Sequence, residues 1–585
     1  MTEREESRME ERKLTGYPSV DKPWMKYYAE EAINSAVPEC TMYEYIRDNN
    51  MNHPNDIALL YFGRKISYKN LIAAIDQTAA AFAELGINRG DVVTIQSLSL
   101  PQVVFAIYAL SKIGAVANII YANSNAAAIK ASMDETNSHV LLIMEPIFDA
   151  VKDSLANSGL NAVIVMRVQD EMDVVTKTIY SVATKAKKIQ AEGLILPWNA
   201  FYAMGRGKTV AVQGKSLDPT IMVYTGGTTG KSKAVVLSNY NINAGALQYV
   251  YLGFERQNIM LCCLPPFIAF GITVTMHTPL AFGLKTALCV GADPTDISGF
   301  VEKYKPNYII CGTAQAEKMM VAIQNKKTNL SFLKCLSLGG DVLPERLEDR
   351  LNEFLIAHNA KIRIAQGYAM TETSAATAAS TRTIDTTVYK KGTIGVPLVH
   401  TNIKIVDPDT GETLQYGQNG EICIHGPCTM MEYFNHPEET SNILKVHDDG
   451  LLWVHTGDIG SVDEDGFISI AGRIKRMILT FEDNVCHKVF PKLLEDEYVK
   501  CTCIKAISIV GKGREDDSLV NDLIAFAVLE DGVSEAAALE ELKTFAQDHF
   551  ESYECPQTYI FIEKLPRTTI GKVDYRALEK EAAKE

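Results

Sequence analysis

The chain has 585 residues, of which 47% are apolar, and a formal net charge of −15 at pH 7. This length is sufficient for several hydrophobic cores and predicts more than one domain. The acidic balance argues against binding to nucleic acid or to an anionic membrane surface, so an anion site would be a local basic pocket. The twelve cysteines lack the spacing of a zinc finger or a CxxC motif, which favours ordinary buried thiols in a reduced compartment.

The first part of the chain predicts a solvated tail. Residues 2–13 are dominated by Glu, Arg and Lys, which is not the pattern of a secretory segment. We therefore expect residues 1–40 to be a tail and a lead-in, and the protein to be cytoplasmic. The longest apolar stretch, residues 103–120, is interrupted by Lys112 and Gly114, which favours a buried helix over a membrane span.

The first two thirds of the chain alternate helical patterns with short β-branched runs. We expect helices over residues 68–85 and 101–113, and strands over 92–95, 139–143 and 162–165. Such alternation is typical of helices that cover largely parallel sheets, so the predicted fold class is α/β. Residues 168–215 are less regular and carry several lysines, which predicts a surface excursion.

A run rich in glycine and threonine follows the apolar residues 221–223. Residues 224–233 read YTGGTTGKSK. The glycines allow a sharp turn that brings backbone N–H groups against an anion, and the hydroxyls and lysines add donors. This chemistry suits a polyphosphate, although the glycine of a Walker A loop is absent six positions before each nearby Gly-Lys-Ser/Thr lysine. The alternative is a polar surface turn.

A compact set of polar residues occupies positions 453–476. His455, Thr456, Gly457 and Asp458 follow an apolar run, and a second short β-branched run precedes a charged link at 472–476. Two short strands that end in such a glycine-led link are compatible with a domain hinge. The alternative for the link is a solvated turn.

A series of motifs, in order along the chain, resembles the adenylate-forming superfamily of acyl-CoA synthetases, firefly luciferase and the adenylation domains of peptide synthetases. The resemblance covers roughly residues 40–580. The matching pieces are residues 224–233, 264–267, 337–341, 366–372, 420–422, 456–458, 472–475 and 565–572. One such piece would be weak, whereas the ordered set is specific.

The resemblance implies that the protein is an AMP-forming acid–thiol ligase. The carboxylate would attack the α-phosphate of Mg·ATP, giving an acyl-adenylate and pyrophosphate, and CoA would then receive the acyl group. Donors and cations placed at the phosphate oxygens would stabilise the transition state more than the ground state. The implied catalytic residues are Lys233 at the β- and γ-phosphates, Thr371 at the α-phosphate, Glu372 as Mg²⁺ ligand, and Lys572 between the substrate carboxylate and the α-phosphate.

The resemblance also implies a set of nucleotide-binding residues. Tyr368 would stack on adenine, Asp458 would accept hydrogen bonds from both ribose hydroxyls, and Arg473 would contact ribose or phosphate. The full implied set is Thr225, Gly226, Gly227, Thr228, Thr229, Gly230, Gly339, Gly340, Asp341, Gln366, Gly367, Tyr368, Asp458 and Arg473.

The implied acid pocket follows the motif at 264–267. Its residues would be Phe267, Ile268, Phe270 and Gly271, and Ile268 stands where the family commonly has histidine or another aromatic residue. These side chains, with Ile272, suit the aliphatic or aromatic tail of a small-molecule carboxylic acid. The alternative is that they are ordinary core.

The resemblance implies a division into two domains. A large N-terminal domain of helix-covered sheets would span residues 41–471, a hinge 472–476 would act through Lys475, and a small mobile α+β lid domain would span 477–585. The lid would rotate between the two half-reactions. We expect no nucleic-acid partner and no membrane span.

One departure concerns the second half-reaction. The family segment after the hinge is usually glycine-rich, whereas Phe481 and Glu482 stand here at the positions of glycines. A pantetheine arm approaches the backbone closely at such glycines. Two alternatives therefore stay open: transfer of the acyl group to a carrier-protein pantetheine, and a degenerate chain that binds nucleotide without catalysis.

Overall fold

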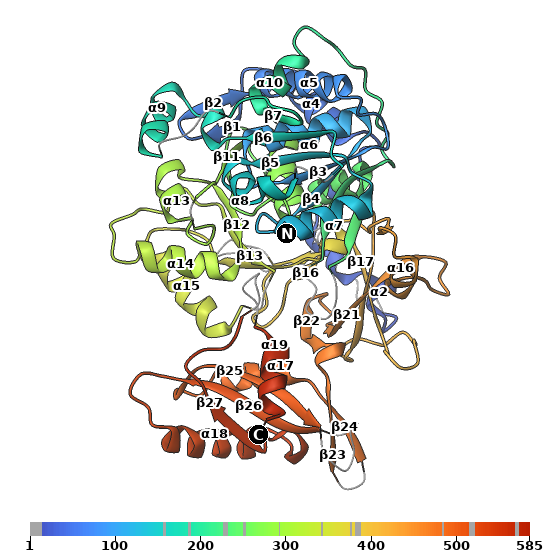
Figure 1. Ribbon diagram of the computed structural model, residues 1–585. Coiled ribbons are helices and arrows are strands. Elements are labelled where there is room, and N and C mark those ends of the chain that lie inside the picture. Colours follow the sequence, from blue (N-terminus) through green and yellow to red (C-terminus); the bar gives the residue numbers. More distant parts are fainter. Residues whose placement is uncertain are drawn as a thin grey trace.

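The computed structural model has a large N-terminal part and a smaller C-terminal part (Figure 1). It describes residues 14–155, 159–184, 189–225, 232–249, 253–291, 293–340, 343–374, 377–380, 388–482, 485–513, 521–567 and 573–584. In the large part, helices cover sheets of mixed and largely parallel strands, and the C-terminal part, orange to red in Figure 1, is α+β. The predicted α/β fold class is confirmed.

Two large sheets dominate the N-terminal part. Among the described residues, one sheet runs β19 (Glu432–Tyr433), β9 (Ala234–Ser238), β8 (Pro219–Tyr224), β4 (Val116–Ile120), β3 (Val92–Gln96), β5 (Val140–Met144), β6 (Ala162–Met166), β7 (Ile195–Pro197). The other runs β16 (Val396–Pro397), β15 (Ala378–Ala379), β14 (Ile364–Tyr368), β13 (Cys335–Gly339), β12 (Tyr308–Cys311), β10 (Ile259–Cys262), β11 (Lys285–Leu288), β1 (Ile57–Tyr61), β2 (Arg64–Ser67). The run from β8 to β7 and the run from β14 to β1 are parallel, as the alternation of the sequence predicts.

A third, antiparallel sheet follows. It contains β17 (Asn402–Val406), β18 (Gly420–His425), β21 (Leu452–Val462) and β20 (Leu444–Val446), and β22 (Ile468–Arg473) pairs with β21. The 3₁₀ segment η7 (Ile474–Arg476) comes directly after β22. The predicted hinge therefore begins at the end of this sheet.

The helices of the large part are α2 (Pro18–Asp21), α3 (Glu30–Ile33), α4 (Met42–Asn50), α5 (Tyr68–Glu84), α6 (Pro101–Ile113), α7 (Ala126–Thr136), α8 (Glu145–Leu155), α9 (Val174–Ala183), α10 (Trp198–Met204), α11 (Asn239–Leu247), η5 (Gly271–His277, π-helical), α12 (Thr278–Ala281), α13 (Ser298–Tyr304), α14 (Thr313–Ile323), α15 (Glu345–Ala357) and α16 (Pro437–Ile443). Most belong to the layers around the two large sheets, whereas α2 packs against β17 and α16 against β19, β20 and β21. Within the described ranges, every helix is too short or too polar to traverse a bilayer.

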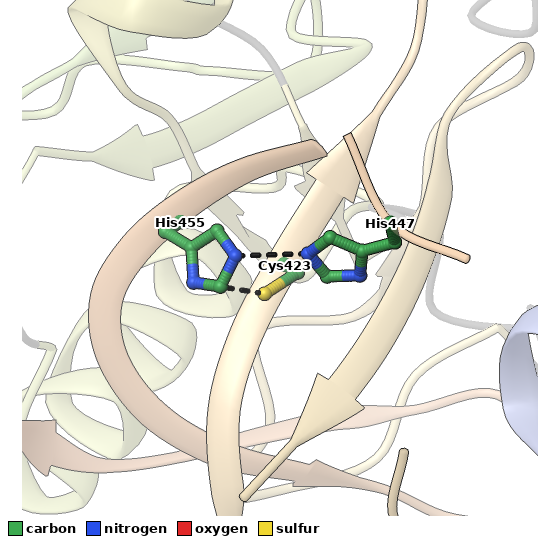
Figure 2. Close-up of side chains that lie close together, drawn as sticks. All are labelled: Cys423, His447 and His455. Atoms are coloured by element: carbon green, nitrogen blue, oxygen red, sulfur yellow. Dashed lines mark hydrogen bonds between the residues drawn. The ribbon is translucent and has the colours of Figure 1, made fainter. Parts of the chain in front are cut away.

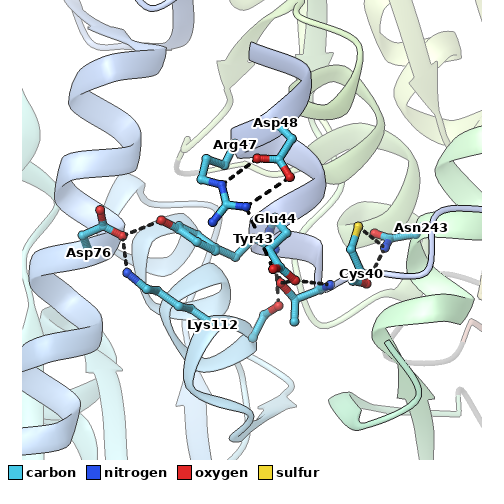
Figure 3. Close-up of polar contacts among 10 residues, drawn as sticks. Cys40, Tyr43, Glu44, Arg47, Asp48, Asp76, Lys112 and Asn243 are labelled. Atoms are coloured by element: carbon cyan, nitrogen blue, oxygen red, sulfur yellow. Dashed lines mark hydrogen bonds and ion pairs between the residues drawn. The ribbon is translucent and has the colours of Figure 1, made fainter. Parts of the chain in front are cut away.

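The apolar stretch 103–120 divides into a helix and a strand. Every residue of α6 is buried, and Gly114 ends the helix with φ 77° in the left-handed region, after which β4 begins. Lys112 donates to the Asp76 carboxylate at 2.7 Å and lies over the Tyr43 ring (Figure 3). The Tyr43 hydroxyl donates to the same carboxylate. This contact explains how a lysine is tolerated inside the buried helix.

The expectation of a surface excursion over 168–215 is wrong for part of that segment. β7 pairs in parallel with β6, and Trp198 and Phe201 of α10 are 1% and 0% exposed. The lysines of this segment flank a short unit of one strand and one helix. Its two buried aromatic residues, Trp198 and Phe201, are too few to produce a hydrophobic periodicity in the sequence. By contrast, α9 has no buried residue.

The C-terminal part has its own hydrophobic core. It consists of a hairpin, β23 (Ile478–Glu482) and β24 (Val485–Val489), a sheet of β25 (Ile504–Gly513), β26 (Asn521–Leu529) and β27 (Thr558–Phe561), and helices α17 (Pro491–Tyr498), α18 (Glu535–His549) and α19 (Tyr575–Ala582). In the described chain, two hydrophobic clusters are built from residues 478 onward. Ion pairs Arg346–Glu530 and Lys488–Asp409 join it to the large part. The exact boundaries 41–471 and 472–476 stay a prediction.

Candidate active site

Motifs from all three large sheets meet at one cleft between the large and C-terminal parts. The cleft has a volume of about 1470 Å³. Its lining includes the predicted residues Thr225, Lys233, Gly340, Gln366, Gly367, Tyr368, Thr371, Glu372, Asp458, Arg473 and Lys475. Predicted residues that lie up to 250 positions apart in the sequence therefore line the same cleft. Most of them lie near the ends of strands, where parallel sheets commonly bind ligands.

The glycine-rich run connects two antiparallel strands, β8 and β9. Thr225 and Lys233 close the connection, because the Thr225 N–H donates to the Lys233 carbonyl at 3.0 Å and the Lys233 N–H donates to Thr225 Oγ1 at 3.2 Å. The Lys233 ammonium lies 4.4 Å from the centre of the Tyr433 ring. The predicted residues Gly226, Gly227, Thr228, Thr229 and Gly230 lie outside the described residues.

Glu372 faces Tyr433, a residue that the sequence reasoning missed. Glu372 lies in the 3₁₀ segment η6 (Thr371–Thr373), and its Oε1 accepts a hydrogen bond of 2.6 Å from the Tyr433 hydroxyl. Burial and the neighbouring Glu372 carboxylate raise the pKa of Tyr433 well above its ordinary value, so the phenol remains a donor. Tyr433 belongs to the two-residue strand β19, which pairs with β9. A strand so short has no recognisable sequence pattern.

The glycines expected near adenine end two neighbouring strands. β13 and β14 are parallel, with Gly339 opposite Gly367. Gly340 has φ 86°, a conformation that favours glycine, and it lines the cleft. Gly339 does not contribute to the cleft lining; a Cβ there would lie 3.4 Å from the Phe270 ring. Asp341 lies outside the described residues.

Asp458 is held between two cleft residues. It lies opposite Arg473 in the β21–β22 pair, and its side chain is 5% exposed. Oδ1 lies 2.7 Å from the Arg473 Nε, and Oδ2 accepts a hydrogen bond of 2.5 Å from the Tyr368 hydroxyl. Burial and the Asp458 carboxylate raise the pKa of Tyr368 well above its usual value, so Tyr368 donates this bond across the neutral range. The acceptor is fixed in position before any ligand binds.

The C-terminal part closes one side of the cleft. Residues 573–576 line it together with Lys475 and Arg476. Arg476 pairs with Glu495 at 2.7 Å and stacks on the Tyr575 ring at 3.5 Å. Lys572 lies outside the described residues.

The four residues of the predicted acid pocket do not line this cleft. Phe267 packs against Tyr121, with ring centres 5.2 Å apart, and Ile268 is 38% exposed. Gly271 begins the π-helical segment η5, and a Cβ there would lie 2.2 Å from the Pro265 carbonyl oxygen. Ile272 is fully buried in the main core, so for this residue the alternative of an ordinary core position is correct.

Family profiles match both parts of the chain. The profile described as AMP-binding enzyme matches residues 46–434, and that described as AMP-binding enzyme C-terminal domain matches residues 494–572. The chain belongs to the AMP-binding enzyme family. This finding confirms the resemblance that the ordered motifs indicate. It also supports the expected class of reaction, in which an acid is activated as an acyl-adenylate and then joined to CoA.

Curated relatives match this AMP-binding enzyme along nearly its whole length. A long-chain-fatty-acid–CoA ligase from Bacillus subtilis is 26% identical over 573 residues, covering 96% of this chain and 98% of the relative. A ligase of the same name from Salmonella typhimurium is 26% identical over 585 residues, with 96% and 98% coverage.

Solved structures share the fold of this AMP-binding enzyme. ATP-bound MatB from Rhodopseudomonas palustris has a TM-score of 0.76 at 21% identity, covering 93% of this chain and 99% of that protein. A fatty acyl CoA synthetase from Mycobacterium tuberculosis has a TM-score of 0.68 at 20% identity, with 93% and 98% coverage.

Proposed function

We propose that this AMP-binding enzyme is an ATP-dependent ligase that joins a long-chain fatty acid to CoA through an acyl-adenylate. The observation that carries the proposal is the convergence of Lys233, Glu372, Asp458 and Arg473 on one cleft. A cation, a hard oxygen ligand and a fixed carboxylate acceptor are the groups that a nucleoside triphosphate needs. The curated relatives named above support the fatty acid as substrate class.

The nucleoside end of ATP would bind where β21 meets β22. Asp458 lines the cleft beside Tyr368 and Arg473, and both oxygens of a carboxylate accept hydrogen bonds. Asp458 would accept from the ribose hydroxyls, while Gly340, Gln366 and Gly367 would border adenine, with Gly339 behind them. Asp341 stays a predicted adenine-binding residue. Tyr368 would supply a ring face to the base.

The phosphate end would bind at the β8–β9 connection. Lys233 and the connection 225–230 would hold the β- and γ-phosphates, and Thr371 would donate to the α-phosphate. Glu372 fits a Mg²⁺ ligand, because its carboxylate lines the cleft and is held by Tyr433, whose ring also contacts Lys233. When bound, the ion would neutralise charge on the phosphate oxygens.

The reaction would proceed by two substitutions. A carboxylate oxygen of the acid attacks the α-phosphorus of ATP, and the bond to pyrophosphate breaks. The thiolate sulfur of CoA then attacks the acyl carbon, and the bond to AMP breaks. The Lys572 ammonium would stabilise the negative charge on the substrate carboxylate and the α-phosphate. Rotation of the C-terminal part about Lys475 would separate the two steps.

The acid would lie near the start of η5. Phe267, Ile268 and Phe270 are partly exposed apolar side chains just before η5, and Phe270 lies against the end of β13 beside the cleft. Phe267 and Gly271 would shape the same wall. An apolar wall of this kind suits an aliphatic tail.

The test is pyrophosphate release over a panel of carboxylic acids of increasing chain length, with and without CoA, followed by mass detection of acyl-CoA. We expect release to be greatest with long-chain acids and acyl-CoA to accumulate. Abundant pyrophosphate with a short or aromatic acid only would overturn the substrate class. Lys572→Ala should abolish adenylate formation and spare thioester formation from synthetic acyl-adenylate; equal losses would overturn that role.

Transfer to a carrier-protein pantetheine is the second candidate. The β23–β24 hairpin exposes two apolar side chains, Phe481 at 42% and Val485 at 51%, as a protein-binding surface would. In that case the wild-type enzyme forms adenylate with its best acid and yields no acyl-CoA at saturating CoA. Under the leading proposal, Phe481→Gly with Glu482→Gly leaves acyl-CoA formation unchanged or faster.

A further inference from the structure

Three adjacent strands bring a cysteine and two histidines to one face of the antiparallel sheet. Cys423 of β18 lies directly opposite His455 of β21. His447 follows β20, the strand on the other side of β21, and its N–H donates to the Leu451 carbonyl to close the turn. Cys423 and His447 are 24 residues apart and His447 and His455 are 8 apart, so the three residues do not form a recognisable sequence motif.

The side chains meet at their ligand atoms, as Figure 2 shows. The Cys423 sulfur and one nitrogen of each imidazole all lie within 4.8 Å of one another. The Nε2 atoms of His447 and His455 are 2.9 Å apart, and the Cys423 Sγ is 3.6 Å from the His455 Nδ1. Two nitrogens on one tetrahedral zinc lie roughly 3.3 Å apart, so the rings need to separate by only a few tenths of an ångström.

A carboxylate supports the central histidine from behind. Glu421 Oε2 lies 2.7 Å from the His455 Nδ1, and both side chains are 12% exposed. A histidine metal ligand commonly donates its other ring N–H to a carboxylate, which fixes the tautomer and raises the basicity of the ligating nitrogen. Here that arrangement leaves His455 Nε2 directed toward His447, whereas the Cys423 sulfur lies near Nδ1 and would have to move toward Nε2 when an ion binds.

The charges around the site are balanced before an ion binds. Lys404 lies 3.5 Å from the His447 Nδ1 and is paired with Asp449. Lys445 lies near Cys423, His447 and Glu421 and offsets the Glu421 carboxylate, so the thiolate that forms at Cys423 on binding supplies the negative charge for a divalent ion. Thiolate and imidazole together select zinc-type transition ions over Mg²⁺ or Ca²⁺.

We propose that Cys423, His447 and His455 form a binding site for a divalent transition ion of the zinc type. The three protein ligands leave a fourth position for water, because His455 and Glu421 border the cleft. Binding would release the thiol proton of Cys423 and cross-link β18, β20 and β21. This site is distinct from the Mg²⁺ position proposed at Glu372 and does not depend on the proposed reaction.

The experiment titrates metal-free full-length protein with Zn²⁺ against a chromophoric chelator, and with Co²⁺ in the absorption spectrometer. We expect one equivalent of Zn²⁺ and a thiolate-to-cobalt charge-transfer band. Cys423→Ser should abolish the band, and His447→Gln should weaken Zn²⁺ binding at least roughly 100-fold, since even supporting carboxylates contribute 10- to 100-fold.

Matched controls are available on the same strand and nearby. His425→Gln changes another histidine of β18, and Cys428→Ser changes another buried cysteine. Both should retain the band and the affinity. His447 lies in a turn, so His447→Gln remains informative if Cys423→Ser fails to fold. Zn²⁺ binding that is absent from the wild type, or equal in wild type and His447→Gln, would overturn the proposal.

Discussion

At the residue scale, the orientation of Glu372 depends on a partner outside every motif. Tyr433 donates to Glu372 and also presents its ring to Lys233, so one side chain contacts both charged groups of the phosphate end. A hydrogen bond to a charged group contributes about 1.5–3 kcal/mol. Tyr433 is therefore a positioning residue in the proposed reaction.

Tyr433→Phe should lower kcat/KM for ATP by roughly 10- to 100-fold and raise the Mg²⁺ concentration needed for half-maximal rate, because the ring is kept and the donor is lost. Initial rates of pyrophosphate release over a Mg²⁺ series measure this. Tyr416→Phe is the control, since Tyr416 also donates to a carboxylate, Asp21, away from the cleft. Equal Mg²⁺ dependence in wild type and Tyr433→Phe would contradict the positioning role.

His277 makes the stability depend on pH. It is fully buried, its Nε2 lies 2.9 Å from Asn243 Oδ1 and its Nδ1 lies 2.9 Å from the Tyr108 hydroxyl, and burial lowers its pKa to about 3. The unfolded chain, with a pKa near 6.5, binds this proton first, so stability falls as pH drops below about 6.5.

At pH 5 the expected loss from His277 is about 2 kcal/mol of unfolding free energy relative to pH 7. Urea unfolding of wild type and His277→Gln at the two pH values isolates this term. Imidazole NMR provides the direct check, since His277 should stay neutral at pH 5. A folded-state titration of its ring near pH 6.5 would contradict the prediction.

At the element scale, helices α4, α5 and α6 are joined by one buried cation. The Lys112 side chain is 8% exposed and its partner Asp76 is 42% exposed (Figure 3). Removing one member of such a pair leaves an uncompensated charge, and partial exposure of Asp76 reduces the cost below that of a fully buried pair.

Asp76→Ala should therefore lower the unfolding free energy by roughly 2 kcal/mol, measured by denaturant titration. The matched control is Asp134→Ala, which breaks the exposed Lys130–Asp134 pair on α7 and should cost less than about 0.5 kcal/mol. Equal losses from the two variants would show that the burial of Lys112 does not matter.

The β21–β22 pair carries the expected ribose contact and is tightly packed beside it. A Cβ at Gly460, two residues after Asp458, would lie 2.3 Å from the Ser469 carbonyl oxygen. Gly460→Ala should separate the strands, destabilise the protein by roughly 1–3 kcal/mol and weaken ATP binding.

Thermal unfolding and nucleotide titration of Gly460→Ala test this expectation together. Gly299→Ala is the control, because a Cβ there meets nothing within 4 Å and the residue lies in helix α13. If Gly460→Ala binds ATP as wild type does, the spacing of the two strands does not set the position of Asp458.

Sequence patterns predict the long elements and the motif residues of this molecule. α6 begins and ends at the expected residues, and Asp458 and Arg473 face each other as a hinge-forming strand pair suggests. Tyr433 and the helix α10 were missed because their contacts join distant parts of the chain and leave no local periodicity. The roles of the motif residues, and the boundaries of the domains, stay predictions.

At the scale of the whole molecule, the C-terminal part is oriented with residues 573–576 toward the cleft and the β23–β24 hairpin at its far end (Figure 1). This orientation places the neighbours of Lys572 at the cleft, as adenylate formation would require. The exposed pairs Arg346–Glu530 and Lys488–Asp409 contribute little to holding it. These two ion pairs would therefore oppose the predicted rotation only weakly.

Lys475→Pro should separate the two half-reactions. Proline fixes its own φ near −65° and restricts the backbone torsions of Ile474 before it. A hinge whose torsions differ between the two orientations can then adopt only one of them. Pyrophosphate release and thioester formation from synthetic adenylate, measured separately, should show one step retained and the other reduced at least 10-fold. Lys475→Ala should retain both steps, and wild-type rates for both in Lys475→Pro would refute the hinge.

The position of Arg473 at the very end of β22 has a thermodynamic consequence. The residue that pairs with Asp458 is followed directly by η7, so a nucleotide bound at this strand end, as proposed, would contact the residue that begins the predicted hinge. Linkage requires that a nucleotide which favours one orientation also binds that orientation more tightly by the same factor. Conversion of ATP to the acyl-adenylate would then act as the timing signal of the proposed cycle.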